Sequence, residues 1–140
     1  MRITDLLDAR SVSLTSSPKT KSEALDQAVA LMTKSGKIND EEAYRSQVYA
    51  REEESTTGIG EGIAIPHGKC DAVSRPGLAA MVIKNGVDFD SLDGEPVTLL
   101  FLIAAPNTKD NVHLDVLSKL SVMLMDLGVS SYQLDTAERG

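Results

Sequence analysis

Tryptophan is absent from this chain of 140 residues, and Phe, Trp and Tyr together make up 4% of it. The core must therefore be aliphatic. The single cysteine, Cys70, excludes an internal disulfide and fits a reducing compartment. The sequence has no run of about 18 apolar residues, the length of a membrane span, and its start, MRITDLLDAR, lacks the apolar segment of a signal peptide. We therefore expect a cytoplasmic protein.

An excess of positive charge is also missing. The formal net charge is -7, and Lys and Arg do not cluster. A nucleic-acid partner would need a basic stripe that displaces phosphate counterions, so we expect none. An acidic surface favours a basic protein partner, although keeping the protein soluble is sufficient reason for the charge.

Common cofactor and hydrolase motifs are missing as well. His67-x-x-Cys70 could form half of a zinc site, but His113 is the only other histidine or cysteine, and a structural site needs four ligands. The GIGEG stretch is not a dinucleotide-binding fingerprint, and the chain has no phosphate-binding P-loop and no G-x-S-x-G elbow. We therefore expect no metal and no cofactor.

The length fits one domain, and helical and strand patterns alternate along it. One helix is expected to begin at Thr20 and a second at Asn39 or Asp40. Asp110 is expected to cap a third helix over 111–125, with Leu114, Leu117, Leu120 and Leu124 on its apolar face. Strands are expected at 62–66, 78–83 and 97–104, with a tight turn at Asn85-Gly86 that returns the chain over 87–89. This order predicts an α/β fold: a single domain with a mixed, mostly parallel β-sheet flanked by helices on both sides.

His67 is the first candidate for chemistry. It follows the apolar triplet Ile63-Ala64-Ile65 and the rigid Pro66, and it precedes the flexible Gly68. We expect it at the exit of a short strand, exposed and oriented, where α/β proteins place functional groups. The alternative is an ordinary surface histidine. The glycines of GIGEG would let a ligand or partner approach the backbone closely.

Two other side chains could assist His67. If Asp110 caps its helix, His113 lies in the first turn, near a natural site for an anion. Its alternative role is only to start that helix. Arg51 could direct its planar fork of donors at a phosphoryl group, or it could satisfy the last carbonyls of its own helix.

These motifs together resemble a known family. The stretch REEESTTGIGEGIAIPHGK, with Arg51 sixteen residues before His67, is similar to the phosphorylation-site signature of enzyme IIA of the bacterial phosphoenolpyruvate-dependent sugar phosphotransferase system. The branch is the fructose/mannitol (type 2) family. FDSLDGEPVTLLFLIAAP resembles its central region, and IAAPNTKDNVHLDVLSKLSVML resembles the segment with its second histidine, here His113. The segments APNTKDNVHLDVLSKLS and RITDLL are most similar to those of fructose-specific members.

The resemblance implies a phosphocarrier that needs no metal or nucleotide. His67 would accept a phosphoryl group from phospho-HPr and pass it to a cysteine of a IIB domain, for the coupled uptake and phosphorylation of fructose or a related sugar. His113 and Arg51 would support the charge, and Thr57 could add a hydroxyl donor. The chain would be linked or docked to a membrane IIC part.

Two points stay open in the sequence. The same histidine could serve a nitrogen-type regulatory IIA, or a IIA-like module of a transcriptional regulator, that acts by protein binding. The resemblance covers residues 1–126, and the segment LGVSSYQLDTAERG at 127–140 departs from it. We expect that segment to be an atypical C-terminal tail, as in a domain cut from a longer chain.

Overall fold

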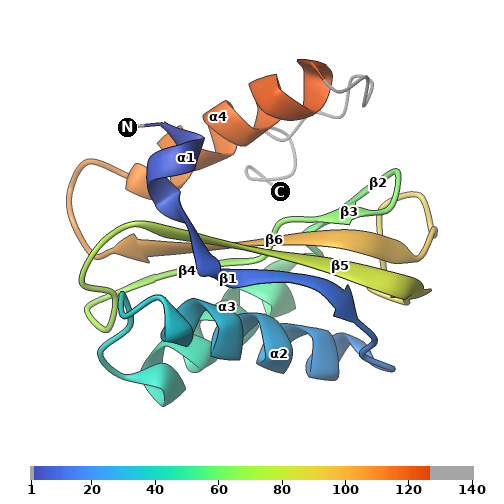
Figure 1. Ribbon diagram of the computed structural model, residues 1–140, viewed down its shortest axis with the longest axis horizontal. Helices are drawn as coiled ribbons and strands as arrows, with labels where there is room; N and C mark the ends of the chain where they lie inside the picture. Colours follow the sequence, from blue (N-terminus) through green and yellow to red (C-terminus); the bar gives the residue numbers. More distant parts are fainter. Residues whose placement is uncertain (1, 127–140) are drawn as a thin grey trace.

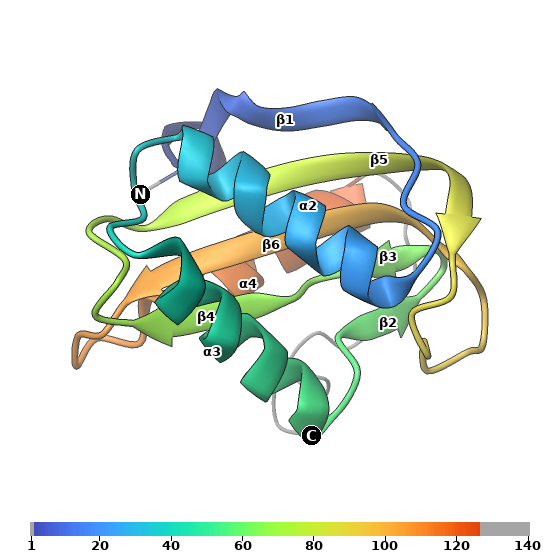
Figure 2. The same cartoon turned by 90° about the horizontal axis from the view of Figure 1, so that it is seen from below.

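The computed structural model of the protein describes residues 2–126, in which one mixed sheet lies between two layers of helices. Helices α2 (Lys21–Lys34) and α3 (Glu41–Glu54) cover one face. Helices α1 (Ile3–Leu6) and α4 (Val112–Asp126) cover the other (Figures 1 and 2). The predicted α/β class with helices on both faces is confirmed.

The described part of the sheet contains six strands in the order β1-β5-β6-β3-β2, and β4 also pairs with β6. The pairs β1/β5, β3/β6 and β4/β6 are parallel, whereas β5/β6 and β2/β3 are antiparallel. The sheet is therefore mixed. The strands are β1 (Leu7–Ser16), β2 (Gly58–Gly60), β3 (Ile63–Ala64), β4 (His67–Cys70), β5 (Gly77–Val87) and β6 (Val97–Pro106).

The predicted helix starts follow capping chemistry. The Thr20 side chain accepts a hydrogen bond from the backbone N–H of Glu23, and the Asp40 side chain accepts one from the N–H of Ala43. Each cap satisfies a donor that the first helical turn leaves without a partner. Gly36, with φ of +79°, follows the end of α2 in a left-handed conformation that favours glycine.

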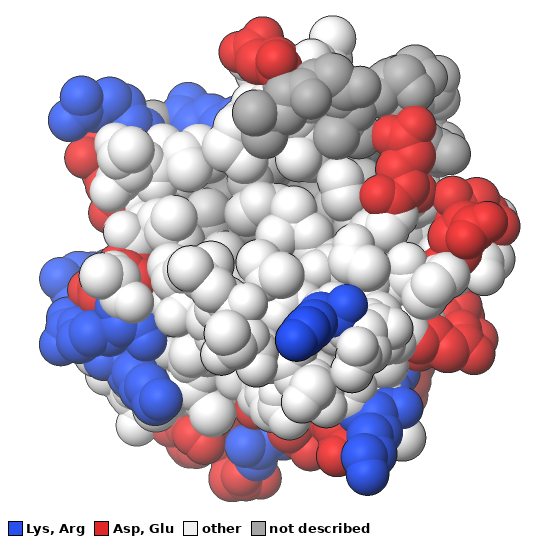
Figure 3. All heavy atoms as spheres, turned by 45° about the vertical axis from the view of Figure 1, so that its right-hand side comes forward, with Lys and Arg blue, Asp and Glu red and all other residues white. Residues whose placement is uncertain are grey.

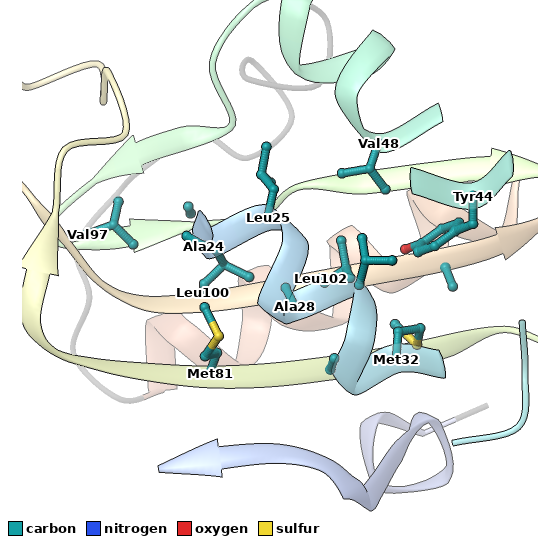
Figure 4. Packing of buried hydrophobic residues seen from close by; sticks show 14 of the residues in the cluster. Ala24, Leu25, Ala28, Met32, Tyr44, Val48, Met81, Val97, Leu100 and Leu102 are labelled. Atoms are coloured by element: carbon teal, nitrogen blue, oxygen red, sulfur yellow. The ribbon is translucent and has the colours of Figure 1, made fainter. Parts of the chain in front are cut away.

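Two apolar cores lie on the two faces of the sheet. Because neighbouring strand residues point to opposite faces, alternate residues of β6 enter different cores. Leu100 and Leu102 pack with α2 and α3 (Figure 4), and Phe101 and Ile103 pack with α4. The α2 and α3 side chains in the first core are Ala24, Leu25, Ala28, Val29, Met32, Tyr44 and Val48.

Two local expectations were wrong. Strand β5 continues through Gly86 to Val87, so Asn85-Gly86 does not reverse the chain; its register against β6 is irregular between Val82 and Val87. Gly86, with φ of +73°, therefore lies in the irregular part of the strand, where its left-handed conformation favours glycine. Leu114 is 43% exposed, whereas the other expected apolar residues of α4, Leu117, Leu120 and Leu124, are buried together with Val116.

Charged side chains on the face drawn in Figure 3 lie mostly toward its rim, while the middle is largely uncharged. Basic groups on this face are interrupted by acidic and uncharged ones, so they form no continuous stripe there. Across residues 2–126, none of the helices has the length and apolar character needed to cross a membrane. The predicted tail at 127–140 lies outside the described residues.

Gly68 sets how closely β4 packs against α3. A Cβ atom added to Gly68 would lie 2.9 Å from Cε1 of Tyr44 and 3.0 Å from Cγ2 of Val48, and both of those side chains are fully buried. Neither neighbour has room to retreat in a packed core. The absence of a side chain at residue 68 is therefore a packing requirement.

We predict that Gly68→Ala lowers the free energy of unfolding by about 1–3 kcal/mol, because the added methyl group overpacks the contact with α3. Urea denaturation measures this change. Lys84→Ala is the control, since Lys84 is an exposed strand residue of β5. Its effect should stay within about 0.5 kcal/mol. Equal stability of Gly68→Ala and the wild type would contradict the packing argument.

Candidate functional site

His67 begins β4 and points to the α4 face of the sheet. Strands β3 and β4 pair with β6 at one constant register: Ile63 lies opposite Leu99, and His67 lies opposite Ile103. Pro66 therefore interrupts the ladder without shifting it. By alternation, His67 shares its face with Ile63 and Ile65, which belong to the α4 core.

The expected exposure of His67 was wrong, because the residue is only 5% exposed. It also starts a strand, whereas a strand exit was predicted. The physical reason is that the chain continues along β6 after Pro66, and the backbone oxygen of Pro66 accepts the N–H of Ile103 at 3.0 Å. The local sequence shows a proline and a glycine, but it does not show this long-range partner.

One ring nitrogen of His67 is held by its own strand. The Nδ1 atom lies 3.3 Å from the backbone oxygen of Ile65. A carbonyl oxygen can only accept, so this hydrogen bond requires the proton on Nδ1. In the neutral ring, Nε2 then carries the lone pair. The strand thus favours Nε2 as the nucleophilic nitrogen.

His113 is the second residue of α4 and stacks against His67. The two ring centroids are 5.7 Å apart, and the ring planes differ by 23°. The helix begins at Val112, so the expected start at residue 111 with Asp110 as its cap was one residue too early. The Asp110 carboxylate instead accepts from the hydroxyl of Thr108, which lowers its pKa.

The start of α4 is joined to β4 beside the histidines. Asn111 has φ of +47°, a left-handed conformation that Asn tolerates better than most residues. Its Oδ1 accepts a hydrogen bond from Nζ of Lys69 at 3.2 Å. This contact ties the residue two places after His67 to the residue two places before His113.

Arg51 lies in the last turn of α3, where its guanidinium donates to the backbone oxygen of Ser55 at 2.9 Å. This contact matches the helix-end alternative. It also holds the Arg51 guanidinium against Ser55, in the segment that leads from α3 to Thr57. The role of Arg51 toward a phosphoryl group stays a prediction.

Thr57 is buried and bound to a carboxylate. Its hydroxyl donates to Oε1 of Glu52 at 2.6 Å, and its N–H donates to Oε2 at 2.8 Å. Nζ of Lys21 lies 2.9 Å from the same Oε2 and 4.6 Å from the centre of the Phe89 ring. The expected donation of the Thr57 hydroxyl to phosphate is untested; in this structure the hydroxyl is engaged by Glu52.

Glu52 and Lys21 were not among the candidates from the sequence. The usable signal was spacing: Tyr44 and Val48 are fully buried at i and i+4, and Glu52 continues that stripe at i+8. An acidic residue in register with a buried face needs partners inside the protein.

The glycine-rich stretch forms a short strand and a turn. Residues 58–60 form β2, and Glu61 and Gly62, both with positive φ, make the turn to β3. A Cβ at Gly58 would meet Oγ of Ser91 at 2.5 Å, and one at Gly62 would meet Oγ1 of Thr98 at 2.9 Å. These glycines, like Gly68, allow close approach of the chain's own segments.

No group of three or more His, Cys, Asp or Glu side chains within residues 2–126 is placed to hold a metal ion. The chemistry available at the site is that of an oriented imidazole beside a second imidazole and a helix N-terminus.

The comparisons with known proteins agree with these features. Residues 5–129 match the family model described as "Phosphoenolpyruvate-dependent sugar phosphotransferase system, EIIA 2". The chain belongs to this family. It is therefore an EIIA-type phosphocarrier domain, a component that transfers phosphoryl groups.

Fructose-specific proteins are among its relatives. The chain is 46% identical over 125 residues to the fructose-specific EIIABC component of Bacillus subtilis, covering 89% of this chain but 20% of that protein. It is 39% identical over 128 residues to the fructose-specific EIIA component of Haloferax volcanii, covering 91% and 83% of the two chains. Nitrogen regulatory proteins are also among the relatives.

A solved structure shares the fold. The complex of enzyme IIAMTL and phosphorylated enzyme IIBMTL from Escherichia coli contains a chain that is 30% identical, with a TM-score of 0.73, covering 85% of this chain and 83% of that chain. The resemblance inferred from the motifs is thus confirmed by both sequence and fold.

Tyr44 supports β6 at the register partner of His67. Its hydroxyl donates to the backbone oxygen of Ile103 at 2.7 Å. We predict that Tyr44→Phe lowers the free energy of unfolding by about 0.5–1.5 kcal/mol, because a buried hydrogen bond is lost. Urea denaturation checks this. Tyr49→Phe is the control, since the Tyr49 hydroxyl bonds to Asp26 in an exposed setting; an equal loss in both variants would contradict the prediction.

Burial also raises the pKa of Tyr44 well above its ordinary value. The unfolded chain therefore ionises this phenol first, near pH 10. The neutral Tyr44 thus stabilises the fold below pH 10, and the stability falls as the pH rises above it. We predict a steeper loss of unfolding free energy between pH 9 and pH 11 in the wild type than in Tyr44→Phe. Parallel curves for the two proteins would contradict this.

Proposed function

We propose that this domain accepts a phosphoryl group on Nε2 of His67 from phospho-HPr and passes it to a cysteine of a IIB domain. The observation that carries the proposal is the stacking of His67 on His113. These are the only two histidines of the chain, they lie 46 residues apart (113 minus 67), and the fold brings their ring centroids to 5.7 Å. Structural burial alone would not require two imidazoles at one point.

The chemistry follows from the oriented ring. The Nε2 lone pair attacks the phosphorus of the donor phosphohistidine, and the bond from phosphorus to the donor nitrogen breaks with its electron pair on that nitrogen. As the new bond forms, the His67 ring gains positive charge. The carbonyl of Ile65, which accepts the Nδ1–H, stabilises that charge.

The onward step reverses the roles. A thiolate of the IIB domain attacks the phosphorus, and the bond to Nε2 breaks with its electrons returning to the ring. Phosphoryl transfer depends mainly on positioning and on stabilising charge. His113, the N-terminus of α4 and Arg51 are proposed to supply that charge.

The names of the relatives support the finer parts of the proposal. We propose fructose or a related sugar as the final acceptor, because fructose-specific proteins are among the relatives. The E. coli complex contains a phosphorylated IIB enzyme, which supports a IIB domain as the acceptor from His67. The EIIABC relative supports linkage or docking to a membrane IIC part.

A regulatory role is the second candidate, supported by the nitrogen regulatory relatives. It shares the phosphorylation of His67 but needs no IIB acceptor. Mixing the phosphorylated domain with a fructose-type IIB domain separates the two. Rapid loss of the phosphoryl group to the IIB cysteine favours the transporter role, and retention on His67 favours the regulatory role.

The site assignment is tested with phosphoenolpyruvate, enzyme I and HPr. We predict that the wild-type domain gains the mass of one phosphoryl group in an acid-labile form, and that His67→Ala gains none because it lacks the nucleophile. Intact-protein mass spectrometry measures this. A His67→Ala protein that still accepts the phosphoryl group would refute the assignment; Lys84→Ala, at an exposed residue of β5, should be phosphorylated normally and is the control.

The second histidine is predicted to act on transfer. His113→Ala should still be phosphorylated, but its transfer to a IIB cysteine should slow by about 100-fold, because one donor that stabilises charge in the transition state is lost. Rapid-quench measurement of the phosphorylated IIB domain gives the rate. An unchanged rate would remove His113 from the site.

A further inference from the structure

A buried polar chain connects Glu52 to the ring of His67. It begins with the ion pair between Lys21 and Glu52, at 2.9 Å, where the Glu52 side chain is only 5% exposed. A buried carboxylate is costly unless its oxygens are paired, and here both are bound. One oxygen accepts the Thr57 hydroxyl, and the other accepts the Thr57 N–H and the Lys21 ammonium.

Thr57 continues the chain toward the site. Its N–H and hydroxyl bind Glu52, while its backbone oxygen accepts the N–H of Ile65 at 3.0 Å. Gly58, the next residue, pairs with Ala64 in the β2/β3 ladder. The hydrogen bond between Thr57 and Ile65 therefore extends the pairing of β2 and β3 by one residue, up to Ile65, which precedes Pro66.

Ile65 is the last link. It receives Thr57 at its N–H, and its carbonyl binds Nδ1 of His67. Pro66 follows directly and has no N–H to offer the sheet. The hydrogen bond from Thr57 holds the peptide group that enters Ile65, and the carbonyl that binds His67 belongs to the next peptide group, joined to the first at the Ile65 Cα.

Stability alone is a weak explanation for this arrangement. Replacing a buried ion pair with apolar residues is often neutral or stabilising, so such pairs are better explained by the conformation that they specify. Glu52 binds both donors of Thr57, its N–H and its hydroxyl, and this pair of hydrogen bonds fixes the orientation of Thr57. These two hydrogen bonds fix the position of the Thr57 carbonyl. Through Ile65, they also fix the orientation of the His67 ring.

We propose that Glu52, held by Lys21, is a positioning residue that keeps the proton of His67 on Nδ1 and leaves Nε2 as the nucleophile. The inference rests on the proposed function for its consequence in catalysis. Its effect on the His67 ring does not depend on that function.

The test compares Glu52→Gln and Thr57→Val with the wild type. Glu52→Gln keeps the shape but removes the charge that binds Lys21 and one of the two oxygen acceptors. Thr57→Val removes the hydroxyl link and leaves the Lys21–Glu52 ion pair in place. Thr57→Ser keeps the hydroxyl and is the rescue variant. Glu53→Gln, at an exposed neighbour, and Thr33→Val, in α2, are the matched controls.

The decisive readout is the tautomer of His67, measured from the ring nitrogen-15 chemical shifts. The chain has only two histidines, so His67→Ala assigns the signals. We expect the Nδ1–H form in the wild type, in Thr57→Ser and in both controls. Glu52→Gln and Thr57→Val should show a smaller fraction of that form, and their rates of phosphorylation by phospho-HPr should fall about tenfold, as for a misplaced nucleophile.

A purely structural role predicts a different result. Both variants would then unfold at lower urea concentration, but the folded proteins would keep the wild-type tautomer and rate, and this outcome would overturn the proposal. Should Glu52→Gln not fold, Thr57→Val decides on its own. If the wild type is not phosphorylated on His67, the proposed function fails, while the tautomer measurement still decides whether Glu52 controls the ring.

Discussion

The parallel pairing of residues 63–70 with β6 is the constraint on which the site depends. Its register is the same before and after Pro66, so the alternation of side chains is preserved across the proline. His67 consequently points to the α4 face, while Gly68 points to α3. A shift of one residue would reverse both and would turn the imidazole into the core beneath α3.

The two faces of β4 make opposite demands on the sequence. Toward α3, Tyr44 and Val48 leave no space for a side chain, and the Tyr44 hydroxyl binds the carbonyl of Ile103. Toward α4, the strand presents an imidazole that must be oriented by polar groups. The edge position of β4 makes this possible, because the Ile65 carbonyl binds the His67 ring while β6 lies on the other side of the strand. Packing on one face and hydrogen bonding on the other together hold the ring.

Much of the architecture could be predicted from local patterns. Capping residues and apolar spacing located α2 and α3, and the apolar run at 97–104 located β6, because these signals act within a few residues. Predictions that depended on distant partners were less successful. Gly86 looked like a turn but sits within β5, and Leu114 looked buried but is exposed on α4. In both cases the local pattern allowed two arrangements, and packing against another element chose between them.

The sequence by itself determined the family, the identity of the two histidines and the chemistry that they can perform, because the PH motif, its upstream Arg51 and the distant His113 are properties of residue type and spacing. Only the tertiary structure decided that His67 is buried, that its Nδ1 is bound to Ile65, and that Glu52 reaches it through Thr57. The physical reason is that hydrogen bonds and burial depend on which segments meet in space. Glu52 and Thr57 are close in the sequence, but Thr57 and Ile65 lie on the two sides of a turn, and their contact exists only after β2 and β3 have paired.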